Sequence, residues 1–221
     1  MKRAFCISLA TLCYFSIHVN GAFADVLFES GTLGPTGVSW MDLQAQSTPG
    51  TNISTFAYNG VRFEFTQPVL TDKIGGHFVA ATEGTFFGAI VELNGASDFP
   101  NSGDLSTPDV VGHALLAFPS SSAEVFSDLK LALTPGWYAL VFGSGLFGAT
   151  TDGGAVRNGM DIGNPSYIAF QPSSAFGWVN ITTFPNHRFV VKGVVVPEPG
   201  VLALVSITLP SILFLALRIR R

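Results

Sequence analysis

Charged residues are scarce in this 221-residue chain, since Asp, Glu, Lys and Arg together make up 12% of it, against about 25% in an average soluble protein. A disordered acidic segment and a basic nucleic-acid-binding protein both need far more charge, so the composition excludes them. Cysteine is nearly absent as well. Cys6 and Cys13 both lie in the first 24 residues. If that segment is removed, as expected below, the mature chain can form neither a disulfide nor a thiolate metal site.

The sequence also lacks long amphipathic helices. No stretch of 12 or more residues free of Gly and Pro carries an apolar stripe with helical period, so the crossover helices that a parallel sheet needs are missing. A repeat of fixed period is missing too, which argues against a propeller or a solenoid. Abundant instead are 24 Gly, 13 Pro and 20 Phe. Because Gly and Pro interrupt helices and aromatic residues favour strands, this composition indicates an all-β protein.

The N-terminus has the order of a secretory signal peptide. Lys2 and Arg3 precede an apolar run, and Ala22 and Ala24 supply the small residues at which a signal peptidase cuts. An uncleaved membrane anchor is the alternative, but polar residues dilute the apolar run. We therefore expect residues 1–24 to be removed and the remainder to be exported.

A second apolar segment, residues 201–217, lies close to the C-terminus and is followed by Arg218, Arg220 and Arg221. As a helix it would span about 25 Å, and local thinning of the bilayer and snorkelling arginines can bridge the gap to a hydrocarbon core of about 30 Å. A buried core helix is the alternative, although no charge interrupts the run. Because positive residues stay on the cytoplasmic side, we expect one membrane span with the preceding domain outside.

Pro197, Glu198 and Pro199 stand just before this segment. Two prolines around one residue hold the chain extended, which leaves an accessible peptide at the membrane face. The order of Pro-Glu-Pro, short apolar helix and terminal arginine cluster resembles the PEP-CTERM sorting signal of Gram-negative bacteria, a tail that is also named after an ice-binding protein.

The resemblance implies a sorting route. In that family a membrane protease of the exosortase type is thought to recognise the Pro-Glu-Pro motif and to release or transfer the protein, often in organisms that make exopolysaccharide. Carried over, Pro197, Glu198 and Pro199 are the recognition element, residues 201–217 the membrane helix, and the three arginines the stop. The resemblance covers residues 197–221 alone and implies nothing about the activity of the exported part.

Residues 25–196 remain as the exported domain. Period-two alternation, as in Val61, Phe63 and Phe65, predicts half-buried strands, whereas continuous apolar runs such as residues 137–142 predict strands buried on both faces. Turn residues, among them Asn59-Gly60, Gly75-Gly76 and Asp152-Gly153-Gly154, divide the pattern. Ten strands are expected, over residues 26–29, 60–67, 73–80, 86–93, 112–118, 124–133, 137–143, 166–171, 177–182 and 188–196. The pattern predicts an antiparallel β-sandwich of jelly-roll type.

The charge of this domain is negative. Residues 25–200 hold 6 basic and 15 acidic side chains, a formal charge of 6 − 15 = −9. Such a surface repels phosphate backbones, so we expect no nucleic-acid partner. Divalent cations and neutral sugars fit it better.

One connection, residues 94–109, is rich in oxygen ligands. Asp98, Asp104 and Asp109 occur there with Asn94 and Asn101, and calcium takes six to eight oxygen ligands from loops of this kind. The spacing differs from the EF-hand loop, and ordinary turn chemistry is the alternative because Asn and Asp side chains bond their own backbone. The three aspartates are the predicted calcium ligands, and no other cofactor is expected.

Catalytic motifs are missing. His77, His113 and His187 form no HExxH pair, and no G-x-S-x-G elbow occurs. His77 and His113 follow glycines in apolar strands, where a histidine is more often a core residue.

Carboxylates and tryptophans leave a glycan-related function open. Glu64, Glu83 and Glu92 lie on or beside predicted strands, but their spacing picks out no pair for glycoside hydrolysis. Three tryptophans would stack against sugars if exposed, or join the core: Trp40, Trp137 and Trp178.

Taken together, these patterns predict an exported surface or matrix protein with a non-catalytic structural or glycan-binding domain. The resemblance of the tail implies three partners, which are an exosortase-type protease, the inner membrane before processing, and exopolysaccharide. The protein's destination is the cell surface or the medium. A secreted glycan-active hydrolase on the same sandwich is the alternative.

Overall fold

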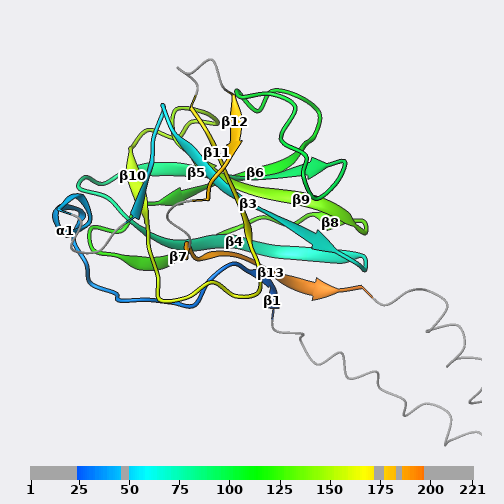
Figure 1. The fold of residues 1–221 in the computed structure, drawn as a ribbon, viewed down its shortest axis with the longest axis horizontal. Coiled ribbons are helices and arrows are strands. Elements are labelled where there is room, and N and C mark those ends of the chain that lie inside the picture. Colours follow the sequence, from blue (N-terminus) through cyan, green and yellow to red (C-terminus); the bar gives the residue numbers. More distant parts are fainter. Residues whose placement is uncertain (1–23, 46–49, 172–176, 183–185, 197–221) are drawn as a thin grey trace, which may run out of the picture.

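The computed structural model describes residues 24–45, 50–171, 177–182 and 186–196. They form thirteen strands in two antiparallel sheets that pack face to face (Figure 1). The prediction of an all-β protein built from two antiparallel sheets is thus confirmed. The described residues contain one short helix, α1 (Trp40–Gln44). Ser39 and Asp42 form a capping box at its N-terminus.

The first sheet has seven strands. Its path runs through β1 (Asp25–Glu29), β13 (Phe189–Val195), β4 (Val69–Val79), β10 (Gly153–Val156) and β2 (Gly50–Ile53). β7 (Ala123–Asp128) and β8 (Ala132–Leu133) also pair with β4. The long strand β4 therefore organises this sheet by pairing along both of its edges.

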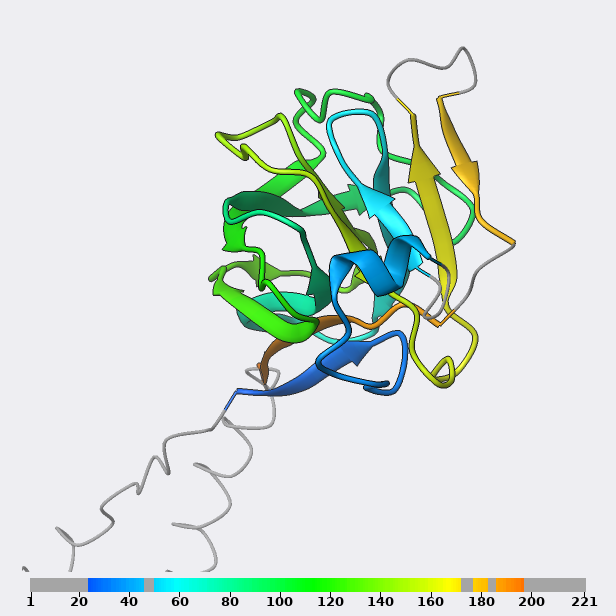
Figure 2. The ribbon, with the colours of Figure 1, turned by 90° about the vertical axis from the view of Figure 1, so that its left-hand side faces the viewer.

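The second sheet has six strands. Its order is β12 (Trp178–Asn180), β11 (Ser166–Phe170), β3 (Tyr58–Phe65), β9 (Gly136–Gly143), β5 (Thr85–Leu93) and β6 (Val110–Ala117). Figure 2 shows β11 and β12 together at one side of the molecule. This side carries the candidate site described below.

The main core lies between the two sheets. Val61, Phe63 and Phe65 of β3 all point into it, as the period-two alternation predicts. Phe78 and Phe142 pack there with ring centroids 4.8 Å apart. The two sheets are thus held together by a dense aromatic layer.

A second apolar cluster covers the other face of the six-stranded sheet. It includes Tyr58, Val141 and Ile168 from the strands and Leu105 from the 94–109 connection. β9 is consequently buried on both faces, which confirms the interpretation of the continuous apolar run at residues 137–142.

The predicted strand over residues 124–133 is wrong as a single element. The structure divides it into β7 and β8. The Thr71 hydroxyl lies 2.5 Å from the Leu129 carbonyl oxygen and accepts a hydrogen bond of 2.9 Å from the Leu131 backbone N–H. The Thr71 side chain thus makes hydrogen bonds where backbone bonds between strands would otherwise continue, between β7 and β8. The alternation of apolar and polar residues in the sequence does not indicate this interruption.

Three glycine-containing turn signals lie inside strands, and two of them, at Gly60 and at Gly75-Gly76, also fall within the strands predicted over residues 60–67 and 73–80. Asn59-Gly60 belongs to β3, Gly75-Gly76 to β4 and Gly153-Gly154 to β10. A Cβ atom on Gly76 would lie 2.2 Å from the Arg188 carbonyl oxygen. These glycines serve close approach between neighbouring strands, which is why β10 and its partner β2 were not predicted.

Both predicted terminal segments lie almost entirely outside the described residues. This applies to Ala22 and to the whole tail from Pro197 to Arg221, while Ala24 is the residue just before β1. Within the described part of the chain, no helix is long and apolar enough to cross a membrane.

Candidate functional site

The candidate site is built around Arg62, in the middle of β3. Because Val61 and Phe63 point into the main core, Arg62 points to the opposite face of the sheet. In the ladder it lies between Ala139 of β9 and Ser166 of β11. It is only 4% exposed, since the start of the 94–109 connection folds over it.

The Arg62 guanidinium donates hydrogen bonds to two neutral acceptors. Nη1 donates to the backbone carbonyl oxygen of Asp98 at 3.0 Å, and Nη2 donates to the side-chain oxygen of Asn180. The guanidinium carbon lies 4.9 Å from the centre of the Phe99 ring. Nε has no hydrogen-bond partner among the described residues. Burial lowers the pKa of Arg62, and the nearby Asp98 only partly offsets this effect.

Arg188 is a second poorly exposed arginine, and unlike Arg62 it forms ion pairs. Its side chain, 12% exposed, donates to carboxylate oxygens of Glu29 and Glu124, each at 2.6 Å. Among the described residues, Arg62 takes part in no such ion pair. The Asp98 carboxylate acts on Arg62 electrostatically but forms no ion pair with it, and a buried charge without a direct partner is costly. The surroundings of Arg62 therefore favour the approach of a negative group.

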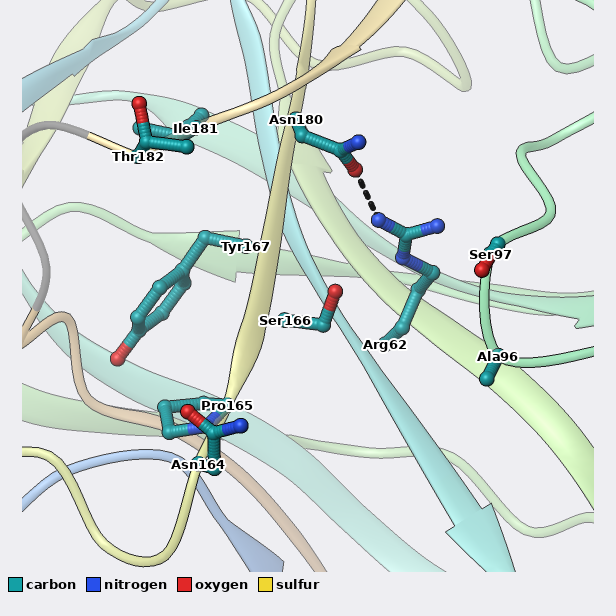
Figure 3. Close-up of a pocket in the computed structure, with 10 residues that line it drawn as sticks. All are labelled: Arg62, Ala96, Ser97, Asn164, Pro165, Ser166, Tyr167, Asn180, Ile181 and Thr182. Carbon is teal, nitrogen blue, oxygen red and sulfur yellow. Dashed lines mark hydrogen bonds between the residues drawn. The ribbon is translucent and has the colours of Figure 1, made fainter.

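A pocket of about 380 Å³ opens beside this guanidinium (Figure 3). It lies where β11 begins and where β12 ends, next to residues that follow β5. Its described polar lining consists of Arg62, Ser97, Asn164, Ser166, Asn180 and Thr182, together with Tyr167, whose hydroxyl is hydrogen-bonded to Asp161 and His187. Figure 3 shows the hydroxyl groups of Ser166 and Ser97 on either side of the Arg62 side chain. The described part of the lining thus combines one cation with neutral donors and acceptors and contains no carboxylate.

The three predicted calcium ligands are not brought together. Asp98 accepts hydrogen bonds from Asn94, Asp104 accepts them from Ser106, and Asp109 accepts one from the Asn101 backbone N–H. These bonds, led by the Asn94 backbone and the Ser106 hydroxyl respectively, lower the pKa values of Asp98 and Asp104.

The described residues contain no group of three or more His, Cys, Asp or Glu side chains arranged to hold a metal ion. The contacts of Asp98 and Asp104 are those of ordinary turns, whereas Asp109 bonds Asn101, eight residues earlier, and its other oxygen is buried without a hydrogen-bond partner among the described residues. Calcium binding stays a prediction that this geometry does not favour. Asp98 still contributes to the candidate site, but through its backbone carbonyl.

Two histidines are buried in a polar network. His77 Nδ1 lies 2.7 Å from the Asn158 side-chain oxygen, and His187 Nε2 lies 2.9 Å from the Thr51 hydroxyl. Burial lowers the pKa of both, that of His187 to about 4. The Tyr167 hydroxyl lies 2.9 Å from the His187 carbonyl oxygen, and burial raises its pKa. Neither histidine is in the described lining of the pocket, and Tyr167, which is, has its hydroxyl hydrogen-bonded to Asp161 and to the His187 carbonyl oxygen.

His113 differs from its prediction as a core residue. It is exposed on β6, a strand at the edge of the six-stranded sheet, and stacks on Phe147 with ring centroids 4.0 Å apart. A neighbouring glycine does not determine burial, because exposure here follows from the place of β6 at the end of its sheet.

The tryptophans are partly buried and pack against the core. Trp137 and Trp178 lie against the second apolar cluster, and Trp40 packs beside Leu43. They therefore pack against the core without being fully buried in it. The strand-associated glutamates are all exposed: Glu64, Glu83 and Glu92.

Arg62 itself was not predicted as a site residue. In an alternating strand, a charged residue between apolar ones indicates a solvated face. Its cover comes from Asp98, 36 residues later, and from Asn180, 118 residues later. No local signal in the sequence identifies these contacts. Searches for similar proteins found no matching family model, curated protein or solved structure.

Proposed function

We propose that this chain is an exported surface or matrix protein whose ectodomain, a sandwich of jelly-roll type, binds a ligand without chemical conversion. In this proposal residues 1–24 direct export, and the tail from residue 197 to 221 anchors the protein in the inner membrane. An exosortase-type protease then recognises Pro197, Glu198 and Pro199 and passes the protein to the cell surface or the medium.

The end of the last strand carries the proposal. β13 ends at Val195, and the Val196 backbone N–H donates to the Pro68 carbonyl oxygen at 2.8 Å. Pro197 is the next residue. All described strands therefore precede the Pro-Glu-Pro motif, and a cut within that motif would remove nothing from either sheet. This is the arrangement that a processed sorting tail requires.

The pocket supports binding over hydrolysis. Glycoside hydrolysis uses two carboxyl groups about 5 to 10 Å apart, and the lining of the Arg62 pocket offers neutral side chains and one cation. Glu64 and Glu92 lie exposed on separate strands. No observation in the described residues favours the alternative of a glycan-active hydrolase.

Replacement of Glu198 by Ala tests the sorting route. The signal peptide acts earlier, so the E198A chain should still be exported, but it should accumulate in the membrane fraction with residues 197–221 attached. Mass spectrometry of both termini and cell fractionation measure the outcome. The matched control is Glu83→Ala, which removes an exposed glutamate of the ectodomain and should leave processing unchanged. Processing of E198A at the wild-type rate would contradict the proposal.

Replacement of Arg218, Arg220 and Arg221 by Ala separates anchoring from cleavage. Without these charges the short helix loses its cytoplasmic stop. We expect the ectodomain to appear outside with its apolar tail still attached. The same mass measurement distinguishes this product from the membrane-bound E198A chain.

A further inference from the structure

We infer that the Arg62 pocket binds a small monocarboxylate that carries several hydroxyl groups, that is, a uronic acid. The inference rests on the proposed binding role of the ectodomain and specifies its ligand. It is carried by the buried guanidinium, by the polar lining around it and by the size of the pocket.

The negative charge of the ligand follows from Arg62. The side chain is 4% exposed, both of its acceptors are neutral, and Nε has no partner among the described residues. A carboxylate in the pocket would accept from the remaining guanidinium N–H groups and would add the direct ion pair that Arg62 lacks among the described residues, beside its electrostatic interaction with Asp98. Such charge-assisted bonds are roughly twice as strong as neutral ones.

A single charge fits better than two. Arg62 is the one cationic side chain in the described lining, and residues 25–200 carry a formal charge of −9. A phosphate group has a charge between about −1.5 and −2 at neutral pH and usually needs several donors or cations. A carboxylate matches the one guanidinium without an excess of negative charge.

The hydroxyl groups of the ligand follow from the rest of the lining. Ser97, Ser166 and Thr182 offer hydroxyls, and Asn164 and Asn180 offer amides. These side chains both donate and accept, as sugar hydroxyls do. The volume of about 380 Å³ lies near the lower end of the roughly 300–1,000 Å³ of small-molecule sites. It suits one sugar or a short oligosaccharide.

Asn180→Asp is the decisive variant, because it places a carboxylate against Arg62 at the position of an existing acceptor. The new ion pair should occupy the guanidinium and leave the fold intact, with a melting temperature at or above that of the wild type. Gln67→Glu is the matched control. It makes the same change from amide to acid at an exposed residue between β3 and β4.

Titration calorimetry on the full chain in detergent micelles would use D-glucuronate, D-glucose and inorganic phosphate as probes. We expect glucuronate to bind at least tenfold more tightly than glucose or phosphate. The N180D variant should lose at least tenfold in glucuronate affinity, and Q67E should stay within twofold of the wild type. Equal binding of glucose and glucuronate, tighter binding of phosphate, or unchanged affinity in folded N180D would overturn the inference.

An oligogalacturonate probe identifies the source of the carboxylate. Tighter binding of the oligomer than of the single sugar assigns the pocket to a polysaccharide, and equal binding assigns it to one sugar unit. Export and C-terminal processing of N180D should match the wild type. A failure of the sorting route is therefore distinguishable from a failure of ligand binding.

Discussion

Asp25 lies directly opposite Gly193 in the antiparallel ladder between β1 and β13. The first strand of the described domain thus pairs with the last one, and Figures 1 and 2 show the two strands together at one edge of the sandwich. Since β13 also pairs with β4, the C-terminal strand is internal to its sheet. The last described strand, β13, therefore lies between β1 and β4 and connects the first strand to the rest of its sheet.

A chain limited to residues 25–196 should fold on its own. All thirteen described strands lie within these limits, so we expect cooperative thermal unfolding in water, measured by circular dichroism. A chain that ends at Arg188 is the control and should not fold, because it loses β13 with the fully buried Phe189 and Val191. An aggregated 25–196 chain would instead place the apolar C-terminal segment in the core.

Gly76→Ala should destabilise the sandwich by about 1 to 3 kcal/mol, the usual cost of overpacking. The added methyl would lie 2.2 Å from the Arg188 carbonyl oxygen, so β4 and β13 would have to separate. Urea denaturation measures the free energy of unfolding. Gly95→Ala is the matched control, since a Cβ atom there meets nothing within 4 Å, and it should change stability by less than about 0.5 kcal/mol. Equal midpoints for both variants would contradict the placement of these strands.

Stability should fall as the pH drops from 6.5 towards 4. Burial holds the pKa of His187 at about 4, against 6.5 for an unperturbed histidine. Between these values the unfolded chain binds a proton that the folded chain does not, so acid favours unfolding. Above pH 6.5 the contribution is complete, and it amounts to about 3 kcal/mol. His77, whose pKa burial also lowers, acts in the same direction.

Melting temperatures between pH 4 and pH 7 test this dependence. His187→Gln removes the titrating group and keeps an amide near the Thr51 hydroxyl, the present partner of His187 Nε2. The melting temperature of this variant should depend less on pH than that of the wild type. The same pH dependence in both proteins would show that another group titrates. The comparable His113→Gln change, at an exposed site, should leave the dependence unaltered.

A metal chelator should leave the melting temperature unchanged. Asp98, Asp104 and Asp109 each accept a hydrogen bond from another residue of the 94–109 connection, so we expect this loop to keep its fold without a bound ion. Differential scanning calorimetry with EDTA and with added calcium measures the effect. An increase with calcium that EDTA reverses would support the predicted calcium site, because a ligand stabilises the state that binds it.

The sequence alone determined the all-β class and most of the strands. Alternation at Val61, Phe63 and Phe65 requires one buried face, and the continuous run at residues 137–142 requires two. Both patterns arise from neighbours along the chain, because side chains alternate across a strand. The same local rules predict the turn residues of the 94–109 connection, where the observed hydrogen bonds join nearby residues.

Only the tertiary structure decided which polar residues are buried and what they contact. The alternation around Arg62 predicts a solvated side chain, and only the structure shows that Asp98 and Asn180 lie beside it. Gly153-Gly154 is expected in a turn, but the structure places it in β10, where a Cβ atom on Gly153 would lie 2.8 Å from the Val79 carbonyl oxygen. In both cases the deciding atoms belong to strands or loops distant in sequence. Periodicity records the direction of a side chain but not the segment that will cover it.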